Sequence, residues 1–326
     1  MKHAFLMDPL AGIKPWKDTT YFLIRACMER GHDVCHIDQR ALWLAHEKPR
    51  AAVDWLELDP DAEIPLRAVR REEIDLAQCD AVWIRTDPPF DRRYFYTTLL
   101  LDRLPASARV VNRPSGIRNL NEKLGALAHP QYTPPTIVTR DAARIEEFAR
   151  QHERITLKPI DGFGGRDILF YRAGEDPAIP ARATRDGNHM TIAQAYLPAA
   201  KEGDKRILLL NGEPLGAILR LHAEGKELNN LDAGGAAHPS ELTPRDWEIC
   251  AALKPSLVEQ GIFFAGIDII GGMLIEINVT SPTGLQELCA FTDTPHHHGI
   301  IEALEKDVAI ARENHRNRKR MGKGGA

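Results

Sequence analysis

The sequence predicts an α/β fold, in which an N-terminal parallel α/β domain precedes a region of α+β character. Short apolar runs alternate with helical segments through the first third of the chain, which is the pattern of a parallel sheet. Further along, Asn211-Gly212 and Gly271-Gly272 each separate two β-branched runs, which is typical of antiparallel hairpins. A chain of 326 residues is too long for one small core, so we expect two or three domains.

The first third contains the expected parallel sheet. Gly31 is the natural residue to end its first helix, because glycine tolerates the left-handed conformation that follows a helix C-cap. Asp8, the segment 85–91 and Asn112-Arg113 fall at the carboxyl ends of strands, where such sheets bind ligands. The expected elements are strands at 4–7, 34–37, 81–85 and from 110, with helices at 20–30 and 94–104.

A domain boundary is expected near 112–135, where the Pro-rich stretch 130–135 ends a helix over 116–128 with Ser115 as its N-cap. The segments 173–188 and 221–238 are polar and glycine-bearing, which favours loops, and the second has the length of a functional lid. The other expected elements are helices at 142–151, 244–260 and from 299 past 312, and strands at 155–158, 167–171, 191–196, 206–210 and 214–220.

Composition excludes several classes of protein. A hydrophobic content of 43%, a charged content of 27% and a net charge of −4 give no argument for nucleic acid or an anionic membrane as partner. Five scattered cysteines without a CxxC pair favour a reducing compartment over a disulfide framework or zinc ribbon. Without a signal peptide or membrane span, we expect a cytoplasmic protein. We read His296-His-His298 as a polar loop and the basic residues 316–326 as a disordered tail.

The segment 265–279 carries three oxygen-bearing side chains, Asp268, Glu276 and Asn278, inside otherwise apolar strands. A two-residue turn at Gly271-Gly272 would put Asp268 on the opposite face from Glu276. A three-residue turn, 271–273, instead pairs Asp268 with Glu276 and Gly266 with Asn278.

Only the second register gathers four isoleucines, 267, 269, 275 and 277, on one buried face. It also sets two carboxylates opposite each other, which repel unless a cation lies between them. Hard oxygen ligands suit Mg²⁺. The alternative is a solvent-facing hairpin with two ordinary surface acids. We favour the metal site because two acids and an amide converge in one register.

A glycine-rich loop lies between two expected strands, in Leu157-Lys-Pro-Ile-Asp-Gly-Phe-Gly-Gly-Arg-Asp167. Without Cβ atoms, its glycines let backbone N–H groups approach a phosphate, and Lys158 can neutralise phosphate charge. The loop is neither a Walker A motif nor a GxGxxG opening a helix. An ordinary glycine-rich hairpin is about as good an account of the loop alone. Together with the acidic hairpin it favours a site for a nucleotide and Mg²⁺.

Several motifs occur in an order that resembles the bacterial (prokaryotic-type) glutathione synthetases of the ATP-grasp superfamily, over about residues 1–310. They are Met7-Asp-Pro9, Asp87-Pro-Pro-Phe-Asp91, Asn121-Glu-Lys-Leu124, Leu157–Gly165, Gln194-Ala-Tyr-Leu-Pro198, Gly203-Asp-Lys-Arg206 and Asp268…Glu276-Ile-Asn278-Val-Thr-Ser-Pro-Thr283. The resemblance implies an ATP-grasp fold behind an N-terminal substrate-binding domain. It implies domains at 1–122, 123–198 (the ATP-grasp lid subdomain) and 199–315 (the subdomain with the Mg²⁺ site), and a homo-oligomer, dimer or tetramer.

The resemblance also implies an activity: an ATP-dependent ligase that joins γ-glutamylcysteine and glycine through an acyl phosphate, with Mg²⁺, or Mn²⁺ in its place. Residue roles follow from the matching positions. The nucleotide would be held by Lys123, Lys158, Gly162, Gly164, Gly165, Gln194, Tyr196, Leu197 and Asp204, and the metal by Asp268, Glu276 and Asn278. Arg206 and Arg220 would face the transferring phosphate, and Asp18, Arg85, Asp87, Asp91, Ser281 and Thr283 the other substrates.

The sequence departs from the family pattern near the acceptor side. Leu228, Asn229 and Asp232 stand where the family lid has arginine, glycine and alanine, and Gln286 stands where bacterial members often have arginine. These changes leave open a ligase of the same mechanism with another acceptor amine or donor peptide. A non-catalytic ATP-binding regulator is a further alternative, disfavoured by the intact lysines and acids.

Overall fold

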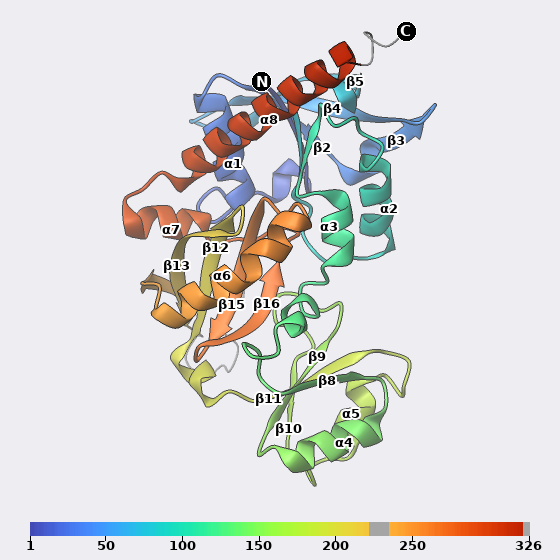
Figure 1. Ribbon diagram of the computed structural model, residues 1–326, viewed down its shortest axis with the longest axis vertical. Helices are drawn as coiled ribbons and strands as arrows, with labels where there is room; N and C mark the ends of the chain where they lie inside the picture. The colour runs from blue at the N-terminus through green and yellow to red at the C-terminus, as the bar shows by residue number, and fades with distance from the viewer. Residues whose placement is uncertain (222–234, 322–326) are drawn as a thin grey trace.

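Three sheets follow one another along the long axis of the molecule (Figure 1). The computed structural model describes residues 1–221 and 235–321. The N-terminal sheet has the order β3-β4-β2-β1-β6-β7, with β5 paired to β4. Its central strands, β1 (Lys2–Leu6), β2 (Asp33–Ile37), β6 (Ala81–Ile84) and β7 (Arg109–Val111), are parallel, as the sequence predicted. The helices of this domain are α1 (Thr19–Glu29), α2 (Arg92–Leu101) and α3 (Pro114–Asn119).

The N-terminal sheet also has an antiparallel edge, which the sequence did not predict. Three antiparallel strands, β3 (Leu42–Ala45), β4 (Lys48–Leu58) and β5 (Leu66–Asp75), extend the sheet beyond β2. The outermost strand, β5, is exposed along most of its length and rich in charged residues. An edge strand of this kind has no apolar run or clean alternation by which the sequence could reveal it.

The second sheet is small, with the strand order β10-β9-β11-β8, and each pair of neighbouring strands is antiparallel. Two helices pack on it, and Ile145 and Phe148 of the first share a core with Leu157 and Tyr171 of the strands. The strands are β8 (Thr136–Thr139), β9 (Ile155–Pro159), β10 (Leu169–Tyr171) and β11 (Thr191–Ala195), and the helices α4 (Ala142–Gln151) and α5 (Ala178–Ala183).

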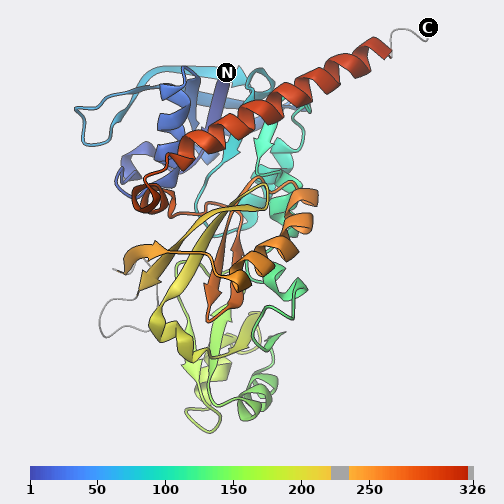
Figure 2. The ribbon, with the colours of Figure 1, turned by 60° about the vertical axis from the view of Figure 1, so that its left-hand side comes forward.

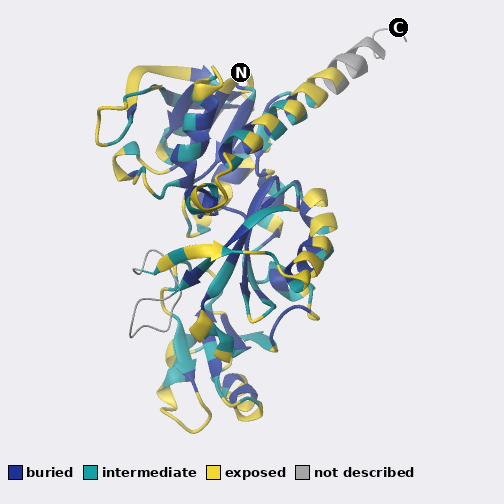
Figure 3. Ribbon diagram, turned by 90° about the vertical axis from the view of Figure 1, so that its left-hand side faces the viewer, coloured by how far each residue is buried: buried dark blue, intermediate teal, exposed yellow. Residues whose placement is uncertain are grey.

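The third sheet, β14-β13-β12-β15-β16, is wholly antiparallel. Its strands are β12 (Asp204–Leu210), β13 (Glu213–Leu221), β14 (Ala236–Ser240), β15 (Phe264–Ile270) and β16 (Met273–Asn278), and α6 (Pro244–Glu259) covers one face. The chain then returns to the N-terminal domain through α7 (Leu285–Thr292) and α8 (His296–Met321). Figure 2 shows α8 crossing that domain, where Ile300, Ile301 and Leu304 join the core of Leu23 and Ile24. The deeply buried positions lie in the strands and beneath the helices (Figure 3).

Several local expectations need correction. The helix expected over 116–128 is α3 followed by a separate 3-10 turn, η4 (Gly125–Ala128), and Arg113 rather than Ser115 is the N-cap. The side chain of Asn121 interrupts the helix because it accepts the backbone N–H groups of Lys123 and Leu124. The expected loop 173–188 contains α5, and 236–238 belongs to β14. The helix α7 was not predicted, and 316–321 continue α8 instead of being disordered.

Asn112 fastens the N-terminal sheet to the third sheet. Its amide oxygen accepts the N–H groups of Phe263 (2.8 Å) and Phe264 (2.9 Å), and its amide nitrogen donates to the carbonyls of Phe264 (2.7 Å) and Val279 (2.8 Å). Asn112→Ala would leave these buried backbone groups unpaired. We expect the free energy of unfolding to fall by roughly 3–5 kcal/mol, measured as a lower urea midpoint. Asn119→Ala, which removes one exposed contact with Gln260, is the matched control, and equal midpoints would contradict the account.

Within the described residues, no helix is both long enough and apolar enough to cross a membrane.

Candidate functional site

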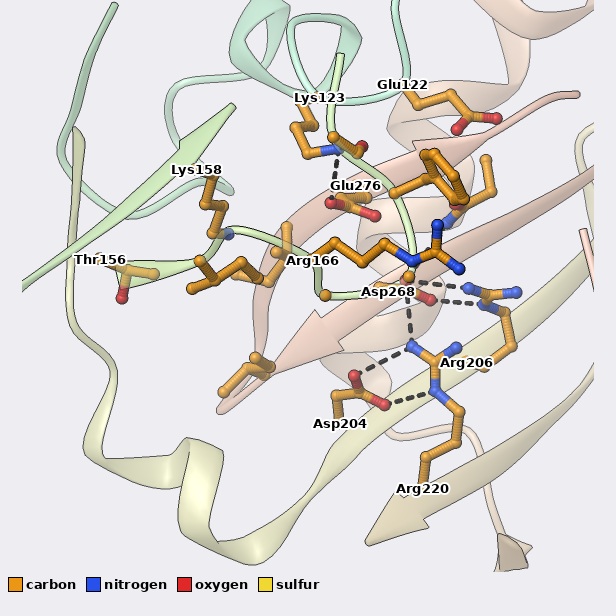
Figure 4. Close-up of a pocket in the computed structure, with 18 of the residues that line it drawn as sticks. Glu122, Lys123, Thr156, Lys158, Arg166, Asp204, Arg206, Arg220, Asp268 and Glu276 are labelled. Atoms are coloured by element: carbon orange, nitrogen blue, oxygen red, sulfur yellow. Dashed lines mark hydrogen bonds and ion pairs between the residues drawn. The ribbon is translucent and has the colours of Figure 1, made fainter. Parts of the chain in front are cut away.

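A cavity of about 390 Å³ lies where the second and third sheets face each other. Strands, the glycine-rich loop and the turn after α3 all contribute side chains to it (Figure 4). Most of the predicted site residues line it: Asp87, Lys123, Lys158, Gly162, Gly164, Gly165, Gln194, Tyr196, Leu197, Asp204, Arg206, Arg220, Asp268, Glu276, Asn278, Ser281 and Thr283.

The β15–β16 hairpin forms one wall of the cavity. Asp268 lies opposite Glu276 and Gly266 opposite Asn278, as predicted. The predicted three-residue turn was wrong, because Ile270 pairs with Met273 across a two-residue Gly271-Gly272 turn. A β-bulge between these pairings reconciles them: Ile269 pairs with Leu274, so Ile275 is the extra residue.

The bulge also changes which side chains reach the core. Ile267, Ile269 and Ile277 are buried beneath the sheet as predicted, but Ile275 lines the cavity and Leu274 takes its place in the core. The extra residue shifts the alternation by one position, so Ile275 and Glu276 both face the cavity. Gly266 lies close behind Arg206 on the same wall, and a Cβ there would lie 3.0 Å from the Arg206 side chain.

Asp268 is the centre of a buried charge cluster. Arg206 donates to both its oxygens (2.5 and 3.0 Å), and a guanidinium nitrogen of Arg220 lies 3.0 Å from Oδ2. Asn278 adds a hydrogen bond of 3.2 Å. Burial alone would raise the pKa of Asp268, but the two guanidinium groups hold it well below its ordinary value. Asp268 is therefore ionised at neutral pH and shares its charge between two arginines.

Arg220 is shared by two carboxylates. It donates to both oxygens of Asp204, at 2.6 and 2.9 Å, in addition to its contact with Asp268. Burial raises the pKa of Asp204 to about 6 although Arg220 opposes the shift, and the neighbouring Asp268 adds to it. Asp204 thus lines the cavity as the orienting partner of Arg220, a contact that sequence reasoning did not foresee.

Two lysines face the acidic hairpin from the other side. Lys123 Nζ lies 3.4 Å from a Glu276 oxygen and donates to the carbonyl of Gly162. Lys158 Nζ donates to Gln194 Oε1 at 2.9 Å, and Gln194 in turn donates to Thr136. Burial lowers the pKa of Lys158, and the charge of Glu276 opposes that shift. The cavity therefore presents cationic nitrogen atoms on several sides, as a polyanion requires.

The glycine-rich loop bends over the cavity through two left-handed residues, Gly164 (φ 60°) and Gly165 (φ 73°). Phe170 and Tyr196 also line the cavity and form an aromatic surface, with their ring centroids 5.7 Å apart. Arg154 stacks behind both rings, 4.3 Å from the Phe170 centroid and 4.5 Å from that of Tyr196. The cavity thus combines charged groups with an aromatic surface, which suits the phosphates and the base of a nucleoside triphosphate.

Three predicted substrate residues do not line the cavity. Arg85 is buried, donates to Thr20 Oγ1 (3.1 Å) and to the carbonyl of Pro282 (3.0 Å), and has its pKa lowered by burial. Asp18 caps α1 through the N–H of Tyr21, and Asp91 caps α2.

Cap residues have their carboxylates partly engaged by the helix, which makes them structural in this conformation. Asp87 does line the cavity, and burial raises its pKa.

The sequence did not predict Glu122 or Arg166 as site residues, although both line the cavity. Glu122 Oε1 accepts the N–H groups of Val279 and Thr280 and the Thr280 hydroxyl, so it fixes the segment that follows β16. Its place in the motif Asn121-Glu-Lys was the available signal. Arg166 follows directly after the glycine pair, but nothing in the sequence shows where its side chain points.

The histidines expected in a loop, 296–298, begin α8 instead. His298 pairs with Glu29 (3.0 Å), and Arg25 lies 3.3 Å from His297 Nε2. A metal ion bound by Glu29, His297 and His298 would have to displace the guanidinium of Arg25.

The hairpin is a better metal site. Two carboxylates and an amide oxygen are hard donors that suit Mg²⁺. Asp268 and Glu276 are paired with cationic side chains in this structure, which shows that these acids need positive charge beside them.

The three sheets, and a cavity lined by lysines, a glycine-rich loop and an acidic hairpin, are the features of an ATP-grasp ligase. The fold matches that of D-cycloserine synthetase DcsG (TM-score 0.66, 18% identity, 94% of this chain and 100% of the other). It also matches the ATP-grasp ligase PsnB with its minimal precursor, Mg and ADP (TM-score 0.61, 15% identity, 94% and 98%). These matches confirm the predicted fold.

Sequence comparison gives the family. Residues 1–118 match the N-terminal domain of prokaryotic glutathione synthetase and 122–293 match its ATP-grasp domain. The chain is 41% identical to the glutathione synthetase of Parasynechococcus marenigrum (94% of this chain, 100% of the relative). It is 40% identical to that of Pseudomonas putida (93% and 97%) and 38% to that of Escherichia coli K12 (94% and 98%). The chain belongs to the prokaryotic glutathione synthetase family of ATP-grasp ligases, which use ATP with Mg²⁺.

Proposed function

We propose that the protein joins γ-glutamylcysteine and glycine into glutathione, with ATP converted to ADP and phosphate. The observation that carries this proposal is the similarity to curated glutathione synthetases of 38–41% identity over nearly the whole of each chain. The cavity supports it, because its charged groups are those that phosphoryl transfer to a carboxylate needs.

The nucleotide would lie along the cavity. Lys123 and Lys158 would meet its phosphates beneath the loop of Gly162, Gly164 and Gly165. Its base would lie beside Tyr196 and Leu197, and backbone groups of residues 194–197 would bind it. Asp204 would orient Arg220 and approach the ribose. Mg²⁺ held by Asp268, Glu276 and Asn278 would neutralise phosphate charge and polarise the transferred group.

The chemistry requires activation of a carboxylate. An oxygen of the cysteinyl carboxylate attacks the terminal phosphorus, the bond from phosphorus to the ADP oxygen breaks, and ADP leaves with that electron pair. The glycine amine then attacks the acyl carbon, the bond from that carbon to the phosphate oxygen breaks, and phosphate leaves with the electron pair while the amine loses a proton. Arg206 and Arg220 would stabilise the charge spread over the phosphoryl oxygens, since both guanidinium groups already converge on a carboxylate at that place.

The donor peptide would lie between the cavity and the N-terminal domain. Asp87, Ser281 and Thr283 line this side. Arg85, Asp18 and Asp91 lie farther back, where a buried cation and acidic groups could receive the carboxylate and ammonium of the γ-glutamyl group. The domain limits 1–122, 123–198 and 199–315 and a homo-oligomeric state belong to the same proposal.

The second candidate function is a ligase of the same mechanism with another acceptor amine or donor peptide. The residue at position 286, a glutamine, favours this candidate. Its side chain is buried, and Oε1 accepts the hydroxyl of Thr19 at 2.9 Å while Nε2 has no partner among the described residues. An arginine there would add a charge beside α1. Leu228, Asn229 and Asp232 lie outside the described residues.

Product analysis separates the candidates. The protein is incubated with ATP, Mg²⁺ and γ-glutamylcysteine, with glycine or with a panel of other amines, while ADP and product mass are followed. We expect glutathione and ADP in equal amounts, with glycine far ahead of other amines. Preference for another amine would support the second candidate, and ATP binding without substrate-stimulated ADP formation would indicate a non-catalytic regulator.

A further inference from the structure

Arg166 occupies an unusual position in the cavity. It follows the glycine pair of the loop between β9 and β10, lines the cavity and is exposed. Figure 4 shows its side chain reaching across the cavity, with the guanidinium directed to the region of Asp268 where those of Arg206 and Arg220 also point. Arg166 comes from a loop of the second sheet and Arg206 and Arg220 from strands of the third, and all three line the same cavity.

The other cations of the cavity are already engaged by protein acceptors. Arg206 and Arg220 hold Asp268, Lys158 donates to Gln194, and Lys123 donates to the Gly162 carbonyl. By contrast, no carboxylate within 1–221 or 235–321 pairs with Arg166, whose guanidinium rests on the Phe163 ring, 4.8 Å from its centroid. Its charge is therefore available to an incoming anion without breaking an ion pair.

The glycine-rich loop supports the side chain of Arg166. The Arg166 N–H donates to the Phe163 carbonyl (3.2 Å), which closes a tight turn, and the ring of Phe163 supports the guanidinium. Gly164 and Gly165 both have positive φ, a conformation that glycine adopts without strain and that shapes this turn. A planar guanidinium on such a loop can form two parallel hydrogen bonds to a phosphoryl group.

We propose that Arg166 is a further catalytic residue, which contacts the phosphoryl group as it passes from ATP to the carboxylate. This inference rests on the proposed function. In the transfer, Arg166 donates N–H hydrogen bonds to the equatorial phosphoryl oxygens, while the carboxylate–phosphorus bond forms and the bond to the ADP oxygen breaks. No proton moves to or from Arg166. Its contact is strongest when negative charge on those oxygens is greatest, so it acts on kcat more than on nucleotide binding.

The test compares Arg166→Ala and Arg166→Lys with Arg150→Ala, a control on an exposed arginine of α4. We expect Arg166→Ala to lower kcat roughly 100-fold, Arg166→Lys to recover part of the loss, and Arg150→Ala to match the parent protein. The ADP dissociation constant should change less than about twofold, and guanidinium ion should restore part of the activity of Arg166→Ala. Retention of kcat within about threefold, or a parallel loss of ADP binding, would overturn the proposal.

A second measurement keeps this test independent of the donor peptide. The affinities for ADP and for a non-hydrolysable ATP analogue are compared by calorimetry in the parent protein and in Arg166→Ala. We expect the alanine variant to lose about tenfold in affinity for the analogue relative to ADP, because only the analogue carries the third phosphate. An unchanged ratio would overturn the role of Arg166. Absence of turnover with γ-glutamylcysteine alongside a changed ratio would instead refute the proposed substrate.

Discussion

Asp268→Asn is expected to lower kcat for ADP formation by roughly 10³-fold. The carboxylate is the common partner of Arg206 and Arg220 and one of two acids proposed to hold Mg²⁺. The amide keeps the shape of the side chain but removes the charge, so the two guanidinium groups repel each other and the metal loses a ligand. The measurement is steady-state kinetics at saturating ATP, with Asp293→Asn, on an exposed residue, as the matched control.

The same variant should be less stable without nucleotide, because Arg206 would lose its carboxylate partner and Arg220 would keep only Asp204. Breaking a buried pair in this way costs about 3–5 kcal/mol. Added ADP should restore more stability to Asp268→Asn than to the parent protein, since its phosphates replace the missing negative charge. A variant with parental kcat and thermal midpoint would show that the cluster around Asp268 is unimportant for both fold and catalysis.

Arg206→Met is expected to lower kcat by roughly 10²–10³-fold, because its guanidinium is aimed at the place where phosphoryl charge develops. Arg206→Lys should recover little, since a single ammonium cannot replace the two hydrogen bonds that the guanidinium makes to Asp268 at 2.5 and 3.0 Å. Both variants are measured for kcat and for ATP KM.

The double variant Asp268→Asn/Arg206→Met tests whether these residues act as one unit. If they do, the kcat of the double variant should lie near that of Asp268→Asn alone. It should then be far higher than the kcat expected if the two separate fold-losses multiplied. Independent multiplication of the losses would contradict a shared site.

The sequence predicted the cavity wall through its register. Alternation of isoleucines with Asp268, Glu276 and Asn278 required the two acids to be opposite each other, and they are. It could not predict the bulge at Ile275, because a bulge leaves no mark in the local sequence pattern. Its position depends on how both ends of the hairpin pack. The turn was therefore wrong although the pairing that matters to the site was right.

Other features depended on contacts between distant segments. Asn112 marked a strand end in the sequence, but its four hydrogen bonds run to residues more than 150 positions away. The pairing of Asp204 with Arg220 follows from the register of β12 and β13, which sets them opposite each other. The edge strand β5 lacked an apolar pattern altogether. Local periodicity thus predicted the core strands. The pairing of charged residues and the attachment of one domain to another could be seen only in the folded structure.

The central claim is that the cavity transfers the terminal phosphoryl group of ATP to the cysteinyl carboxylate. The direct measurement uses γ-glutamylcysteine with heavy oxygen in that carboxylate, followed by mass analysis of the phosphate released with glycine present. The account predicts that one labelled oxygen passes from the peptide into each phosphate, because the acyl phosphate keeps the bridging oxygen on phosphorus when glycine attacks. Phosphate without label, released together with glutathione, would contradict it.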